Sequence, residues 1–225
     1  MLNLFESWME WCKNNNITKV IYKAIPHIYH RLPADDDLYA LWRNGAILKT
    51  VNLSSTIDLN NIQPYNTPQK RHLKEATALC PWIRETQYAA EFMPILTECL
   101  RSRHNATPVH NTEELSLLKE RFPDNIRLFL CGTSHDIEAA ACIYDTAGTA
   151  HCQYLATTES GRKNGTLTYL LNHLITETFA SRRYFDFGIS NENNGLYLNT
   201  GLLHQKSWLG GRGIAYQIFE LSLRS

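Results

Sequence analysis

The chain has 225 residues with 22 basic and 22 acidic side chains, so its formal net charge is zero. Hydrophobic residues make up 44% and charged residues 20% of the sequence, which excludes a disordered or fibrous protein. This length suits one large domain, or one domain and a fragment, and needs no disulfide or metal for stability. The zero net charge argues against broad electrostatic binding of DNA or of an anionic membrane.

Cysteine usage and the N-terminal sequence bear on the cellular compartment. The N-terminal MLNLFESWMEW contains Glu6 and Glu10 and lacks the basic start of a secretory signal peptide. No run approaches the ~18 apolar residues of a membrane span, so we expect a cytoplasmic protein. The six cysteines show no C-x-x-C spacing, which indicates buried free thiols. They are Cys12, Cys80, Cys99, Cys131, Cys142 and Cys152.

The N-terminal third predicts a helix, a strand, a second helix and a second strand. Leu2–Lys13 has apolar residues at helical spacing, and Lys19–Ile25 is a strand candidate. The carboxylates of Asp35–Asp37 favour a helix start, because they complement the positive end of a helix dipole. Gly45 ends that helix, and Ala46–Leu59 predicts a long strand.

From Pro81 onward the predicted order is strand, two helices, three strands, helix, strand, helix, strand. Glu114 stands at the reciprocal capping position to Asn111, which predicts a helix start. Short turn-rich segments separate the three consecutive strands and favour an antiparallel meander. The predicted elements are a strand at Pro81–Glu85, helices at Tyr88–Leu100 and from Asn111, strands from Ile126, Ile137 and Thr149, a helix from Gly161 to about Ala180, a strand at Arg183–Ser190, a helix near Gly195 and a strand at Gly213–Leu221.

The two ends of the chain share an order of elements. Helix, strand, helix, strand describes both the N-terminal third and the segment after Gly161, and we interpret this as a degenerate internal repeat. The predicted domains are a half-domain at 1–63, a linker helix at 64–80 and a complete domain at 81–225. An unrelated N-terminal extension is the alternative.

Short phrases along nearly the whole chain, together with this order, carry a resemblance to a known family. The phrases are YKAIPHIYH (Tyr22–His30), LYAL (Leu38–Leu41), LSSTIDL (Leu53–Leu59), SRHNATPVH (Ser102–His110), FPDNIRLF (Phe122–Phe129), YFDFGISNENNG (Tyr184–Gly195) and GLLHQKSWLGGRG (Gly201–Gly213). They resemble the FemAB-like branch of the GNAT acyltransferase superfamily, in which two GNAT-like domains stand in tandem. The resemblance implies an α/β fold with a mixed sheet. A full tandem protein would carry a strand meander before Met1, so a truncated first domain is expected.

The same resemblance implies a donor site at the end of the strand from Thr149. In GNAT proteins this strand diverges from the next one, and its N–H groups bind the acyl donor. The turn that follows would receive a pyrophosphate. The pattern R-x-x-G is present, but Leu167 stands where a small residue is usual, and an ordinary helix cap is the alternative. The implied donor residues are Leu155, Ala156, Thr157, Gly161, Arg162, Lys163, Asn164 and Gly165.

Three residues near the C-terminus are candidate catalytic groups. Lys206, near the G-G turn, would hold an anionic acceptor or neutralise a tetrahedral intermediate, and a solvated lysine is the alternative. Asp186 lies between aromatic residues and is expected to be half-buried, as a general base or a structural acceptor. Tyr197 would protonate a leaving thiolate or serve only in packing.

The loop at Ser102–His110 is expected to border the acceptor. Arg103 and His110 are candidate substrate-binding residues, and His104 or His110 would accept a proton from an attacking amine or stabilise the loop. The lone H-x-x-H of His27 and His30 does not favour a metal site.

These observations predict an N-acyltransferase that moves an acyl group from acyl-CoA to an amine of a small molecule or peptide. The first alternative is an aminoacyl-tRNA-dependent transferase of the FemAB type, which zero net charge does not favour. The second is a binding module that has lost catalysis. We expect no metal, no DNA and no membrane span. Exposed strand edges of an incomplete domain make a homodimer a further expectation.

Overall fold

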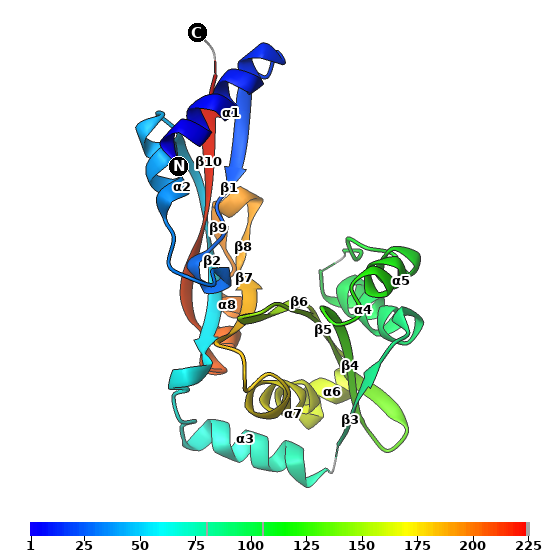
Figure 1. The fold of residues 1–225 in the computed structure, drawn as a ribbon. Coiled ribbons are helices and arrows are strands. Elements are labelled where there is room, and N and C mark those ends of the chain that lie inside the picture. Colours follow the sequence, from blue (N-terminus) through cyan, green and yellow to red (C-terminus); the bar gives the residue numbers. More distant parts are fainter. Residues whose placement is uncertain (80, 105, 224–225) are drawn as a thin grey trace. The chain divides into compact units, whose positions relative to one another are not determined.

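The computed structural model describes residues 1–79, 81–104 and 106–223, and the chain forms two compact units (Figure 1). The first unit comprises Met1–Ser55, Ile189–Ser207 and the chain from Arg212; the second comprises Thr56–Gly188 and Trp208–Gly211. Most of the last helix and the last strand therefore belong with the N-terminal elements. The internal repeat, with its division at 1–63, 64–80 and 81–225, stays a prediction.

The first unit contains a layer of strands, the helices α1 and α2, and most of the last helix. Its main elements are α1 (Leu2–Asn14), β1 (Lys19–Lys23), α2 (Asp36–Arg43), β2 (Ile47–Asp58), whose end lies in the second unit, and β10 (Arg212–Ser222), with a 3₁₀ turn at His27–Tyr29. The strand order is β1–β10–β2, and β1 is antiparallel to β10. Phe5 and Leu41 share one buried cluster, and Cys12 packs with Leu221. Each of α1 and α2 therefore buries part of its apolar surface, whereas Leu4, Trp11 and Trp42 are exposed.

A hairpin, rather than a helix, occupies the segment around Gly195. β8 (Asn191–Glu192) pairs with β9 (Tyr197–Leu198) across a 3₁₀ turn, and α8 (Thr200–Trp208) begins only afterwards. The predicted helix start near Gly195 is wrong. Gly195 has φ +89°, which favours glycine, and an added Cβ would lie 2.5 Å from Thr50. The backbone conformation of Gly195 and its close packing against Thr50 therefore favour a turn here instead of a helix.

The second unit contains the predicted meander. Its elements are a 3₁₀ turn (Leu59–Asn61), α3 (Thr67–Ala78), β3 (Trp82–Thr86), α4 (Ala89–His104), α5 (Thr112–Arg121), β4 (Ile126–Thr133), β5 (Asp136–Asp145), β6 (Thr149–Thr157), α6 (Glu159–Asn164), α7 (Thr166–His173), a π-helical turn (Leu174–Thr178) and β7 (Tyr184–Ile189). The strand order is β7–β6–β5–β4–β3. Strands β3 to β6 are antiparallel and β6–β7 is parallel, which confirms a mixed sheet.

Helices cover both faces of this sheet. Figure 1 shows α4 and α5 on one face and α6 and α7 on the other. Leu128 and Cys142 face α4, where they join Phe92, whereas Phe129 and Ile143 face α7. Alternate residues along each strand therefore serve two separate cores. Asn111 and Glu114 form the predicted capping box at the start of α5.

The single helix predicted from Gly161 to Ala180 is wrong, because the segment is broken. α6 ends before Gly165, which has φ +69°, and α7 starts directly after it. A Cβ on Gly165 would lie 2.9 Å from His72 and 3.2 Å from Ala76, both on α3. Packing of α3 against this turn therefore requires glycine, a long-range constraint that helical periodicity does not reveal.

Glu138 of β5 connects the sheet to α6 and α7. Its buried carboxylate accepts hydrogen bonds from Thr133, from Asn164 of α6 at 2.9 Å and from Thr166 of α7. Gly161 packs directly on the same residue, since an added Cβ would lie 2.3 Å from the Glu138 carbonyl oxygen. The first turn of α6 is thus fixed on the backbone of β5.

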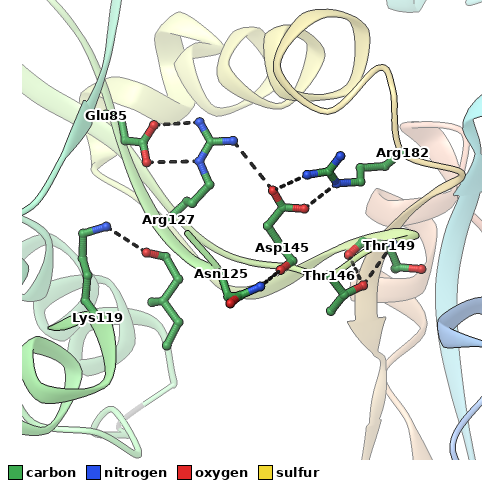
Figure 2. Close-up of polar contacts among 9 residues, drawn as sticks. Glu85, Lys119, Asn125, Arg127, Asp145, Thr146, Thr149 and Arg182 are labelled. Carbon is green, nitrogen blue, oxygen red and sulfur yellow. Dashed lines mark hydrogen bonds and ion pairs between the residues drawn. The ribbon is translucent and has the colours of Figure 1, made fainter. Parts of the chain in front are cut away.

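An ion-pair network joins three strands to the segment before β7 (Figure 2). Arg182 donates to both Asp145 carboxylate oxygens, at 2.6 and 2.8 Å. Arg127 donates to Glu85 at 3.1 and 2.7 Å and lies 3.9 Å from Asp145. Lys119 donates to the Ile126 carbonyl oxygen at 2.8 Å. Because only 5% of Asp145 is exposed, these arginines supply the countercharge that its burial requires.

We predict that Asp145→Asn lowers the free energy of unfolding by about 2–3 kcal/mol, because it leaves two arginines without their shared anion. The control is Glu98→Gln, which breaks the exposed pair with Arg101 and should cost no more than ~0.5 kcal/mol. Urea denaturation followed by circular dichroism measures both. Equal losses in the two variants would contradict a structural role for the network.

We also predict that Gly161→Ala destabilises the protein by about 1–3 kcal/mol, because the new methyl group meets the backbone of β5. Gly148→Ala is the matched control, since an added Cβ there has no neighbour among the described atoms within 4 Å. Its stability should stay equal or rise by up to ~1 kcal/mol. Thermal unfolding of the two variants measures the difference. Similar melting temperatures would contradict the close packing of Gly161 on the backbone of β5.

Candidate active site

Strands β6 and β7 pair over only a short length before they separate. The described register pairs Thr149 with Tyr184, Ala150 with Phe185 and His151 with Asp186. Further along β6, Leu155, Ala156 and Thr157 have partners in β5 and none in β7 within that register. Gly188 has φ +75°, so β7 changes direction shortly after the last pair. The predicted divergence of the two strands is confirmed.

A β-bulge in β6 lies next to the point of separation. Cys142 pairs with Tyr154 and Ile143 pairs with Cys152, so Gln153 is an extra residue relative to β5. A bulge bends its strand and increases the local twist. Beyond it, alternate residues of β6 direct their N–H and C=O groups away from β5. The strand therefore presents a row of backbone groups on the side from which β7 has departed.

Asp186 and His151 form a close polar pair at the last paired position. Nδ1 of His151 lies 2.6 Å from Oδ2 of Asp186, and Thr56 donates to Oδ1 at 2.7 Å. Asp186 is fully buried, rather than half-buried as predicted, whereas 21% of the His151 side chain is exposed. Sequence reasoning missed His151, since only the register of β6 with β7 places it beside Asp186.

The turn predicted to receive phosphates is engaged within the fold. Thr158 caps α6 by accepting the Gly161 N–H at 3.1 Å, and Gly165 packs under α3. The three polar side chains of this turn also have partners: Arg162 with the Thr157 carbonyl oxygen at 3.3 Å, Lys163 with Glu159 at 2.8 Å and Asn164 with Glu138 at 2.9 Å.

Two further features of this turn bear on a pyrophosphate ligand. The buried Glu138 carboxylate lies beneath the turn, and a second anion close to it would be repelled. His72 and Ala76 of α3 lie against Gly165 on the outside, and the His72 ring contacts Trp208 edge-to-face at 5.5 Å. The binding of a pyrophosphate at this turn stays a prediction.

The predicted acceptor loop contacts β6 through one residue. Nδ1 of His110 lies 2.7 Å from the Tyr154 hydroxyl, one position beyond the bulge. Arg103 is exposed in the last turn of α4. The predicted role of His104 concerns a side chain that lies outside the described part of the chain. The structure thus brings His110, but not Arg103, to the diverging strand.

Lys206 and Tyr197 belong to the first unit. Lys206 is buried in α8, and its Nζ donates to the Ile189 carbonyl oxygen at 2.7 Å, so it is not a solvated lysine. Tyr197 is 53% exposed on β9. Asp186 and the candidate donor residues belong to the second unit.

The cysteines and histidines provide little further chemistry. Burial raises the pKa of Cys131 and of Cys142 to about 12, so these thiols are not nucleophiles near neutral pH. Within the described ranges no cluster of three or more His, Cys, Asp or Glu side chains is placed to hold a metal ion. The prediction of buried free thiols is confirmed for the five described cysteines, while Cys80 lies outside the described residues.

No helix in the described ranges combines the length and apolar character needed to cross a bilayer. No protein-family model and no curated protein matches the sequence.

Solved structures do match. FemX aligns with a TM-score of 0.74 at 10% identity, over 98% of this chain and 76% of its own. L-PGS from Bacillus licheniformis aligns with a TM-score of 0.68 at 11% identity, over 98% and 73%. The C-terminal domain of an Agrobacterium fabrum protein described as a lysylphosphatidylglycerol synthetase gives 0.68 at 9% identity, over 96% and 71%. At such identities the similarity concerns the fold. Together with the mixed sheet and the separation of β6 from β7, it shows that this chain has a GNAT-like fold related to that of FemX.

Proposed function

We propose that this protein is an N-acyltransferase that moves an acyl group from an activated donor to an amine. The separation of β6 and β7 after His151 and Asp186 carries this proposal. It leaves backbone N–H groups of β6 beside the bulge at Gln153, where a donor carbonyl would bind. Preorganised N–H donors stabilise the oxyanion that forms when a nucleophile attacks a carbonyl.

The candidate residues have distinct roles in this proposal. Leu155, Ala156 and Thr157 belong to the stretch of β6 that would hold the donor. Lys206 would neutralise an anionic acceptor or the tetrahedral intermediate, and Tyr197 would give a proton to the leaving group. His110, which binds Tyr154 of β6, would contact the acceptor.

Two classes of molecule are candidates for the acyl donor. Acyl-CoA is the donor that the resemblance to GNAT proteins implies. The engaged turn at Thr158–Gly165 instead favours a donor whose binding does not depend on a pyrophosphate at that place. An aminoacyl ester carried by tRNA is such a donor. One structural neighbour is named for lysylphosphatidylglycerol, a product that carries an amino-acid acyl group.

Transfer assays with both donors test the proposal. The protein is incubated with acetyl-CoA, with longer acyl-CoAs and with aminoacyl-tRNA, each with a panel of amines, and mass spectrometry detects the amide product. We expect an amide from at least one class of donor. If no donor yields an amide, while a ligand still raises the melting temperature, the chain is a binding module rather than an enzyme.

Variants of the turn distinguish the two donors. Arg162→Gln with Lys163→Gln removes two exposed positive charges, so it should weaken acyl-CoA binding about tenfold if the turn contacts phosphates. Transfer from an aminoacyl ester should be unchanged by this double substitution. Binding of tRNA should weaken as salt rises, because it releases counterions.

A further inference from the structure

An open pocket lies in the second unit between the start of α4 and the second half of α5. These two helices cover the face of the sheet that is turned away from α6 and α7 (Figure 1). The pocket has a volume of about 320 Å³, and its walls include Tyr88, Ala89, Ala90, Ser116, Lys119 and Glu120. None of these residues is among the donor, acceptor or catalytic candidates, so the pocket is separate from the candidate active site.

Lys119 is a buried cation in the wall of this pocket. Only 4% of the residue is exposed, and its Nζ donates one hydrogen bond, to the Ile126 carbonyl oxygen at 2.8 Å. It forms no ion pair with any residue in the described ranges. Figure 2 shows that the carboxylates of Glu85 and Asp145 are instead joined to arginines. Because an ammonium group has three N–H donors, Lys119 retains donors and charge for a further partner.

The titration of Lys119 reflects this missing countercharge. Burial lowers the pKa of its ammonium group from the ordinary value, because the charged form is desolvated. The carboxylates of Glu85 and Asp124 act in the opposite direction but do not cancel this effect. An anion bound in the pocket would stabilise the charged ammonium, since an uncompensated buried charge is costly.

The start of α4 adds backbone donors to the same pocket. The Tyr88 N–H binds the Thr86 hydroxyl at 3.2 Å, and the Glu91 N–H binds the Tyr88 carbonyl oxygen at 3.1 Å. The N–H groups of Ala89 and Ala90 have no acceptor in the part of the chain that the structure describes. The first N–H groups of a helix attract anions. A buried cation and a helix start thus favour an anion in one pocket.

The charges around the pocket limit the charge of that anion. Glu120 lines the pocket and is exposed, whereas Glu91 in the first turn of α4 is already paired with Arg84 at 2.8 and 3.0 Å. One lysine beside one carboxylate suits a ligand with a single negative charge, because Glu120 would repel the second charge of a phosphate. A carboxylate carries one charge and accepts several hydrogen bonds.

We propose that this pocket binds the carboxylate of a small organic molecule and that Lys119 is its counter-ion. This site lies apart from the separation of β6 and β7, so it does not depend on the proposed acyl transfer. The carboxylate has two possible sources. One is a free amino acid, whose ammonium group would face Glu120, and the other is a simple organic acid, which gains nothing from Glu120.

NMR titration of the ¹⁵N-labelled full chain tests the proposal. The probes are the protein amino acids one at a time, acetate and propionate, and we expect at least one to shift the amide signals of Ala89 and Ala90 in a saturable way. The primary amide of that probe lacks the negative charge, so it should bind at least about tenfold more weakly. Glu120→Gln distinguishes the two sources, because it should weaken binding about tenfold for an amino acid and not for a simple acid.

Lys119→Met removes the charge, keeps the length of the side chain and should weaken binding at least about tenfold. Lys74→Met, at an exposed position of α3, is the control and should keep the Kd within about twofold. Should Lys119→Met not fold, Ala90→Trp replaces it, because Ala90 is exposed and a large side chain there fills the pocket without removing the Lys119 hydrogen bond.

Three results would overturn the proposal. The first is that no probe shifts the signals of Ala89 and Ala90 at roughly 10 mM, which is beyond the millimolar range of weak binding. The second is that the uncharged amide binds as tightly as the acid. The third is that the folded Lys119→Met variant, or Ala90→Trp in its place, binds as tightly as the parent. Each leaves the proposed acyl transfer untouched, because the transfer assays measure a different site.

Discussion

The candidate site depends on how β6 pairs with its two neighbouring strands, β5 and β7. β6 pairs with β5 along nearly its whole length, but the bulge at Gln153 shifts that register, and pairing with β7 ends two residues earlier. Because a bulge bends and twists its strand, β6 cannot remain parallel to β7 beyond this point. Backbone groups that lose a strand partner need water or a ligand instead. The bulge in β6 and the positive φ of Gly188 in β7 both lie close to the point where the two strands stop pairing.

Two buried carboxylates fix the ends of this region in different ways. Asp186 holds the inner end, where its oxygens bind His151 and Thr56. Glu138 holds the outer end, where its carboxylate binds Asn164 and Thr166 and its carbonyl oxygen receives the Thr158 N–H. A buried carboxylate is costly unless hydrogen-bonded, so each makes its surroundings rigid. Asp186 lies next to His151, whose side chain is partly exposed. The side-chain donors to the Glu138 carboxylate are neutral hydroxyl and amide groups.

Local signals in the sequence predicted the elements well, and long-range constraints explain the errors. The capping box at Asn111 and the three-strand meander depend on neighbouring residues, and both are confirmed. The break at Gly165 depends on contact with α3, and the turn at Gly195 depends on contact with β2. The pairing of His151 with Asp186 depends on a parallel register 35 residues apart in sequence, which periodicity cannot specify. Burial of Lys206 likewise follows from its bond to the Ile189 carbonyl oxygen.

The sequence YFDFG shows how one strand can serve stability and chemistry together. Phe185 and Phe187 point into the α7 core, so β7 is anchored by apolar burial on one face. That anchoring lets Asp186 occupy the opposite face without water, where its charge acts on His151 through a low dielectric. Gly188, with φ +75°, is the next-to-last residue of the strand, which ends at Ile189. A slip of one residue would exchange these faces and place phenylalanine beside His151, so the same register that completes the core also assembles the polar pair.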